Sequence, residues 1–225
     1  MSNHVEQVAQ TEPRTTRRRR PWVGLLALLV VAFLLFTWPS YLTFDPATAN
    51  IPIDPDLYRI QYPLLVLHIA FGSVAMIAGA LQLWPWLRRR HRAVHRATGR
   101  IYIFGGVGPA AVAALIIMPM GALNVLGMIG TTLWAVVGLG AALLGALAIK
   151  RGRRERHRQW MIYSFAAVMA PITGRLMFFV LLAVVPGGEN MVGSLGVFGG
   201  FWLGWIVNLA LAYWRLRRVP VLPRR

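Results

Sequence analysis

The sequence predicts an all-α protein, a polytopic transmembrane bundle of about six helices with both termini in the cytoplasm. Its 225 residues are 57% hydrophobic and only 14% charged, whereas soluble domains average about 25% charged residues. The stretch 101–149 carries no charged residue, and it is long enough for two spans of roughly 20 residues with a turn between them. The third observation is that the basic residues form clusters between apolar segments.

Six apolar segments are long enough to cross a bilayer as helices, and the chain lacks the ten-residue alternation of an outer-membrane barrel. The predicted spans are residues 21–38, 62–86, 101–118, 123–149, 160–185 and 195–214. Residues 1–20 form a basic tail that we expect to be disordered, and residues 216–225 form a second basic tail. Tryptophans lie at span ends, as interfacial anchors do: Trp22, Trp38, Trp84, Trp86, Trp160 and Trp214.

The orientation follows from four clusters that hold 22 of the 24 lysines and arginines. They are Arg14 with Arg17–Arg20, Arg88–Arg100, Lys150–Arg158 and Arg215–Arg225. The other three loops carry Asp45, Asp54, Asp56, Arg59 and Glu189. Because short loops rich in Lys and Arg stay cytoplasmic, the alternation places both termini inside.

Span 1 allows a second interpretation. The arginines before it, its apolar core and Ala47-Thr48-Ala49 could form a signal peptide with a cleavage site. The apolar core is long and the small residues lie well beyond it, which favours an uncleaved anchor. If cleavage occurs, five spans remain.

The net charge of +17 would indicate a nucleic-acid partner in a soluble protein. Here the charges punctuate apolar segments, so the expected partners are the lipid bilayer and anionic lipid head groups at the cytoplasmic rim. No nucleic acid is expected. The chain has no cysteine, which excludes disulfides, cysteine-ligated clusters and thiol chemistry.

Span 2 carries two polar residues on either side of a strip of small ones. His68, Gly72, Ala75, Gly79 and Gln82 share one helix face,. Small residues let another helix backbone, or a flat cofactor, come close. His68 lies in the outer half of the span, where it is either a neutral histidine bonded to a neighbouring helix or a ligand or proton carrier.

Arg175 is the one basic residue inside a predicted span, and no acidic residue lies within any span. It could extend outward to Glu189 or to lipid phosphates. It could instead bind an anionic group inside the bundle, such as a haem propionate or a substrate phosphate, because a buried guanidinium needs a partner. Its depth is similar to that of His68, so the two could share one pocket.

Three histidines, His91, His95 and His157, lie on the basic rim. His95 and His157 open the helices of spans 3 and 5, and two imidazoles from separate helices could ligate a haem iron. Alternatively, all three belong to the lipid-facing rim, where the arginines disfavour a metal cation. The His-Glu-x-x-His pattern of metalloproteases is absent, and no metal site is predicted.

A weak repeat links spans 2–3 to spans 4–5. Gly79-Ala80-Leu81 leads to His95-Arg96 and Pro109, and Gly145-Ala146-Leu147 leads to His157-Arg158 and Pro171. The pattern indicates either a parallel duplication or coincidence among common residues. In span 6, Gly196, Gly200 and Gly204 form a packing stripe, either inside the bundle or in a homodimer.

The combined motifs resemble those of a bacterial family of multi-pass membrane proteins catalogued as a domain of unknown function. They are His68-Ile-Ala-x-Gly72, Gly79-Ala-Leu-Gln82, His95-Arg96-x-x-Gly99-Arg100-Ile-Tyr102, His157-Arg158-x-Trp160-Met161 and Arg175-Leu176. The resemblance implies a polytopic protein of the bacterial inner membrane and no established reaction. A more distant likeness is to six-span, ascorbate-reducible cytochrome b proteins, although only His68 lies well inside a span.

Three functions are compatible with these residues. A redox protein would hold a b-type haem between His95 and His157, with a quinone near His68 and Arg175. A transporter or binding protein for a small anion or lipid would use Arg175 as the anion contact and His68 as the proton carrier. A membrane scaffold would use the polar residues only to hold helices together.

Overall fold

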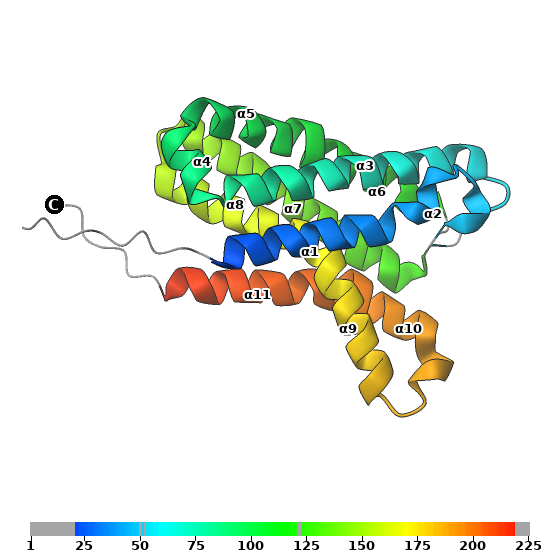
Figure 1. Ribbon diagram of the computed structural model, residues 1–225. Helices are drawn as coiled ribbons and strands as arrows, with labels where there is room; N and C mark the ends of the chain where they lie inside the picture. The colour runs from blue at the N-terminus through cyan, green and yellow to red at the C-terminus, as the bar shows by residue number, and fades with distance from the viewer. Residues whose placement is uncertain (1–20, 50, 52, 121–122, 219–225) are drawn as a thin grey trace, which may run out of the picture.

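A computed structural model describes residues 21–49, 51, 53–120 and 123–218, and Figure 1 shows them as a bundle of helices. No strand occurs among these residues. The helices are α1 (Pro21–Thr37), α2 (Pro39–Leu42), η1 (Pro46–Thr48), α3 (Tyr58–Gln82), α4 (Pro85–Arg90), α5 (Arg92–Tyr102), η2 (Ile103–Val107), α6 (Gly108–Ile117), η3 (Met118–Met120), α7 (Val125–Lys150), α8 (Arg154–Val168), α9 (Ala170–Val184), η4 (Gly188–Met191), α10 (Val192–Gly196), η5 (Val197–Leu203) and α11 (Gly204–Arg217).

The described chain contains four to five candidate membrane spans. Four helices are long and apolar enough: Tyr58–Gln82, Arg92–Met120, Val125–Lys150 and Val192–Arg217. Helices α8 and α9 qualify together, as one span bent by 47°. Helix α1 is apolar but has 17 residues, roughly 25 Å at 1.5 Å per residue, which is less than the ~30 Å hydrocarbon core. The predicted all-α membrane bundle is confirmed at this level.

Helix boundaries differ from the predicted spans at the basic loops. Helix α5 begins at Arg92, well before the predicted start at residue 101, because arginine and alanine are strong helix formers outside the membrane too. Helix α3 ends at Gln82, earlier than predicted, because the residue before a proline avoids helical dihedrals. Trp84, which precedes Pro85, is extended.

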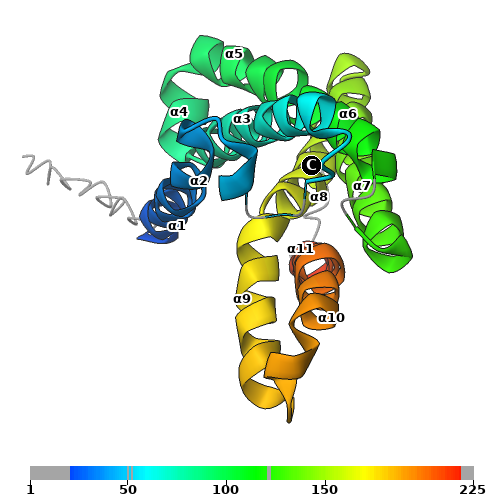
Figure 2. The same cartoon turned by 90° about the vertical axis from the view of Figure 1, so that its right-hand side faces the viewer.

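The arrangement separates a main bundle from a tilted pair. In Figure 1, α1, α3, α5, α7, α8 and α11 lie roughly along one direction, whereas α9 and α10 lean away from them. Figure 2 shows α9 and α10 side by side, below the rest of the bundle. Helix α3 packs on α5 and α6, α7 packs on α8, and α9 packs on η5 and α11.

We call the end with α4, the α7–α8 turn and the last turn of α11 the basic end, on the left in Figure 1. The opposite end carries α2 and the loop to α3. Helix α1 is attached to α3 by a hydrogen bond of 3.1 Å from Trp38 Nε1 to Ser73 Oγ.

Candidate functional site

The predicted strip on α3 faces α5, η2 and α6. His68 Nδ1 lies 2.8 Å from the carbonyl oxygen of Ala110 on α6. A carbonyl only accepts, so Nδ1 donates, and the neutral ring keeps its lone pair on Nε2. At the other end of the strip, Gln82 Nε2 donates to the carbonyl of His95. The two polar residues therefore tie α3 to the following helix at both ends.

Between these bonds, Ala75 and Gly79 are closely packed, whereas a Cβ on Gly72 would have no described neighbour within 4 Å. A Cβ on Gly106 would lie 2.9 Å from the Cα of Ala75, so η2 and α3 are in backbone contact. A Cβ on Gly79 would overlap the ring of Phe165 and approach that of Tyr102 to 3.0 Å. At Ala75 and Gly79, the close neighbours that the strip predicts are a helix backbone and two aromatic rings.

The structure brings His95 and His157 near each other at the basic end. The His95 imidazole lies within electrostatic range of the His157 imidazole and of the Arg88 guanidinium. His157 Nδ1 donates to the Gly145 carbonyl at 2.8 Å. His95 Nδ1 is buried and has no hydrogen-bond partner among the described residues. His91 is the residue between α4 and α5; its carbonyl accepts a hydrogen bond of 2.9 Å from the backbone N–H of His95, and its ring centroid lies 4.4 Å from that of Trp86.

Helices α7 and α8 pack closely beside these two histidines. A Cβ on Gly145 of α7 would lie 2.8 Å from Met161 Sδ on α8. Deeper in the bundle, Tyr102 and Phe165 occupy the space over Gly79. The described residues also contain no group of three or more His, Asp or Glu able to hold a metal ion.

Arg175 lies on α9 against α1. Its guanidinium carbon is 4.8 Å from the centroid of the Phe33 ring, and Nη1 lies 3.4 Å from the carbonyl oxygen of Pro171. It is also within electrostatic range of Tyr41. The alternative partner, Glu189, has its side chain outside the described part of the structure. His68 bonds to α6 while Arg175 contacts α1, so no described contact joins the two predicted site residues.

Helices α8 and α9 meet at the bend that precedes Arg175. Pro171 has no N–H and cannot bond to the carbonyl of Ala167, four residues earlier. Trp134 Nε1 on α7 donates to that carbonyl at 2.8 Å. Asn208 Nδ2 on α11 donates to the adjacent carbonyl of Ala166 at 3.0 Å. Side chains from two other helices therefore satisfy the carbonyls at the bend.

Neither Trp134 nor Asn208 was predicted from the sequence. Pro171 was a usable signal, because a proline inside a span leaves a carbonyl that needs another donor. Asn208 is fixed in turn by Thr173, whose hydroxyl lies 2.9 Å from Asn208 Oδ1.

No curated protein and no solved structure matches the chain, and the distant likeness to six-span cytochrome b proteins finds no support. Residues 65–215 match the family described as predicted membrane protein (DUF2306). These residues include the α3 strip, both basic-end histidines and Arg175. The chain therefore belongs to this family of multi-pass membrane proteins of unknown function.

Proposed function

We propose that the protein binds an anionic group, the phosphate of a lipid or a small organic anion, inside its bundle at Arg175. The observation that carries the proposal is the half-buried position of this guanidinium between α9 and α1. Its surroundings supply the Phe33 ring, one distant carbonyl and the nearby Tyr41, and no described carboxylate forms an ion pair with it. A half-buried cation without a counter-charge is costly, so a bound anion would stabilise it.

The donor geometry suits a phosphate or carboxylate. A guanidinium presents several N–H donors in a planar fork, which matches two acceptor oxygens at once. The Phe33 ring interacts with the face of the cation and leaves the edge of the fork available. These properties favour an oxyanion as the ligand.

A neighbouring hydroxyl could add a further donor. Phe33, Thr37 and Tyr41 are spaced by four residues, and Trp38 continues the helical conformation between α1 and α2. The three residues therefore lie on one face of this helix. Phe33 and Tyr41, at the two ends of the set, both lie near Arg175. Thr37 Oγ1 is buried and has no hydrogen-bond partner among the described residues.

The proposed setting is a six-span protein in the bacterial inner membrane, with both termini cytoplasmic. Helices α1 and α2 would together form the first span, and the basic end would face anionic head groups in the cytoplasmic leaflet. The support is the concentration of basic side chains at that end,. His68 has a structural role in this proposal, because its Nδ1 proton is held by the Ala110 carbonyl.

The test compares Arg175→Gln with Arg175→Lys and with Arg90→Gln, an exposed rim variant. Purified protein is titrated with phosphatidylglycerol, with phosphatidylcholine and with inorganic phosphate, and the shift in thermal unfolding midpoint is measured. We expect stabilisation by phosphatidylglycerol or inorganic phosphate that is lost in Arg175→Gln, weakened in Arg175→Lys and retained in Arg90→Gln.

Equal stabilisation of the native protein and a folded Arg175→Gln variant would overturn the proposal. If Arg175→Gln fails to fold, the Arg175→Lys variant provides the test. Full stabilisation of Arg175→Lys by the ligand would overturn the proposal, because an ammonium lacks the planar fork of donors. A Soret band in protein from haem-replete cells, lost in His95→Ala, would favour the redox hypothesis instead.

A further inference from the structure

The bend between α8 and α9 is bridged by one side chain. Asn208 on α11 donates from Nδ2 to the carbonyl of Ala166, in the last turn of α8, at 3.0 Å. Its Oδ1 lies 2.9 Å from the hydroxyl of Thr173, in the first turn of α9. Because an amide oxygen only accepts, the Thr173 hydroxyl donates, and both bonds agree with one orientation of the amide. A single amide therefore joins the two arms of the bend, α8 and α9.

The backbone alone holds this bend weakly. Pro171 has no N–H that could bond to the preceding turn. The backbone N–H groups of Ile172 and Thr173 both point to the carbonyl oxygen of Met169, at 3.2 and 3.4 Å. These distances exceed the roughly 2.9–3.0 Å of a typical N–H···O bond. The bend of 47° therefore depends on side-chain contacts as well as on backbone bonds.

Helix α11 gives the Asn208 amide a firm support. A Cβ on Gly204 would lie 2.7 Å from the carbonyl oxygen of Ala170, so α11 and α9 are in backbone contact one turn before Asn208. This close packing fixes the position of Asn208 relative to α9. Its bond to Ala166 then fixes α8 relative to both.

The angle of the bend sets the distance between Arg175 and α1. Arg175 is six residues beyond Met169, roughly 9 Å along the helix, and a change of ~20° in the bend would displace it by about 3 Å. Its guanidinium carbon lies 4.8 Å from the centroid of the Phe33 ring, and such contacts extend to about 6 Å. A displacement of this size away from α1 would therefore separate the cation from the ring.

We propose that Asn208 is a positioning residue of the anion site. By joining Ala166 to Thr173, it holds α9 at the angle that keeps Arg175 against α1. The inference rests on the proposed function of Arg175, and it adds that the affinity for the anion depends on a side chain of α11.

The first measurement is a distance that depends on no ligand. The chain has no cysteine, so spin labels can be attached to the full chain at Leu28→Cys on α1 and Val184→Cys on α9, which are 64% and 67% exposed. Double electron–electron resonance in detergent gives the distance between the labels. Val184 lies ~22 Å along the helix from Met169, so a change of ~20° moves it by about 8 Å. We expect a shifted or broadened distance distribution in Asn208→Leu.

The second measurement is the shift in thermal unfolding midpoint caused by phosphatidylglycerol. We expect Asn208→Leu to require about tenfold more lipid than the native protein for half of the full shift. Trp134→Phe is the matched control, because Trp134 also donates to a carbonyl at the bend, that of Ala167, but bonds only to the α8 arm. It should lower the unfolding midpoint and leave both the label distance and the lipid requirement unchanged.

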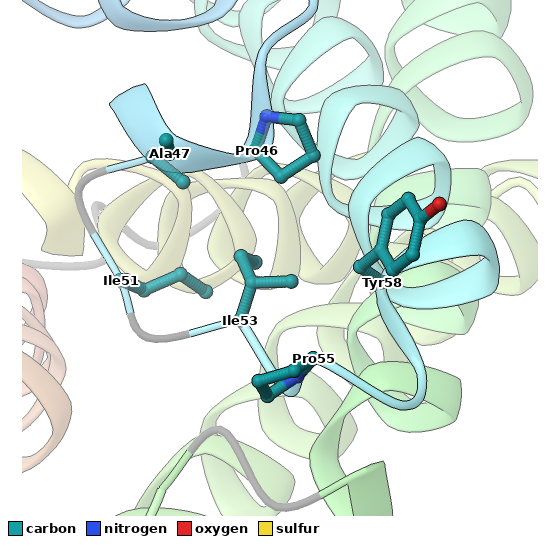
Figure 3. A pocket seen from close by; sticks show the side chains of 7 residues that line it. Pro46, Ala47, Ile51, Ile53, Pro55 and Tyr58 are labelled. Atoms are coloured by element: carbon teal, nitrogen blue, oxygen red, sulfur yellow. The ribbon is translucent and has the colours of Figure 1, made fainter.

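A hollow at the end of the bundle opposite the basic end calls for a second control. Figure 3 shows its lining side chains, which come from the loop between α2 and α3 and from the first residue of α3. Lipid held there would stabilise the protein without Arg175. Ala47 lines the hollow and is exposed, so Ala47→Trp narrows it and should leave the lipid response unchanged. Loss of the response in Ala47→Trp would overturn the assignment of binding to Arg175, and the label distance would still test Asn208.

An unchanged label distance in a folded Asn208→Leu variant would overturn the inference, and so would equal effects of Asn208→Leu and Trp134→Phe on both measurements. If Asn208→Leu does not fold, Thr173→Val replaces it, because this variant removes only the bond to the α9 arm. A lipid response that is lost in Arg175→Gln but kept in full in Asn208→Leu would leave the Arg175 proposal intact and overturn this one.

Discussion

The hydroxyl oxygens of Tyr102 on α5 and Ser164 on α8 lie 2.8 Å apart, in the interior of the bundle. Tyr102 is 1% exposed and Ser164 is 0% exposed. The two residues are 62 positions apart in the sequence, the same interval that separates His95 from His157. If the chain arose by duplication, this hydrogen bond joins equivalent positions of the two units.

The same interval relates Pro109 to Pro171, and both prolines follow an irregular stretch of helix. Before Pro109 the chain forms the π-helical turn Ile103–Val107, and before Pro171 it bends at Met169. A proline leaves a carbonyl of the preceding turn without its usual donor, and a π turn is one way to absorb the change. The π-helical turn before Pro109 and the bend before Pro171 are therefore two different local conformations next to a proline.

The Tyr102–Ser164 bond should contribute measurably to stability. We expect Tyr102→Phe and Ser164→Ala each to lower the free energy of unfolding by about 1–2 kcal/mol, because each leaves a buried hydroxyl unpaired. The double variant should be less destabilised than the sum of the two. Unfolding in sodium dodecyl sulfate gives the free energy of unfolding of all three variants. If the losses of the two single variants add up to that of the double variant, the two hydroxyls are not directly coupled.

The bend between α8 and α9 gives a second prediction, in which a proline and a tryptophan are coupled. Trp134→Phe should cost about 1–3 kcal/mol, because the Ala167 carbonyl loses its donor. Pro171→Ala restores an N–H that can bond to this carbonyl, so Trp134→Phe should cost much less in that background. Unfolding free energies of the four proteins test this, and an unchanged cost of Trp134→Phe in Pro171→Ala would show that the carbonyl finds no new donor.

The contact between Arg175 and Phe33 gives a third prediction. Phe33→Leu removes the ring next to the guanidinium and should lower stability by about 0.5–2 kcal/mol, whereas Phe33→Trp should preserve it. Both are compared by thermal unfolding with Phe36→Leu, a replacement at an exposed position of the same helix. An equal loss of stability in Phe36→Leu would show that the effect of Phe33→Leu comes from apolar packing instead.

Hydropathy and charge predict most of the fold because both reflect the bilayer directly. Residues 125–150 are helical almost as predicted, since a long apolar run in lipid must satisfy its own backbone bonds,. The bend at Met169 is invisible to hydropathy, because residues on both sides are apolar. Its position depends on Pro171 together with Trp134 and Asn208, which come from distant parts of the chain.

The candidate site was also only partly predictable, because some of its contacts come from distant parts of the chain. The α3 strip could be read from helical spacing, and so could its need for a close neighbour. What fills the strip depends on Gly106 and Phe165, which pack onto it from other helices. The burial of Gln61, which is 0% exposed, had no sequence signal, and the backbone N–H of Asp54 in the preceding loop donates to its amide oxygen.

The glycines of the last span give a fourth prediction, which separates internal packing from self-association. A Cβ on Gly204 would lie 2.7 Å from the carbonyl oxygen of Ala170 and 2.9 Å from the Cα of Gly174. Gly204→Ala should therefore push α11 from α9 and destabilise the protein by about 1–3 kcal/mol. Nothing lies within 4 Å of a Cβ on Gly196, so Gly196→Ala should leave the unfolding free energy nearly unchanged.

The open position of Gly196 also allows a test of the homodimer alternative for the glycine stripe. If Gly196 and Gly200 approach a second copy, Gly196→Ile should convert a dimer to a monomer without loss of fold, because the bulky side chain blocks close helix contact. Size-exclusion chromatography with light scattering in detergent gives the mass of each variant. An unchanged mass in a folded Gly196→Ile variant would show that Gly196 does not hold two copies together.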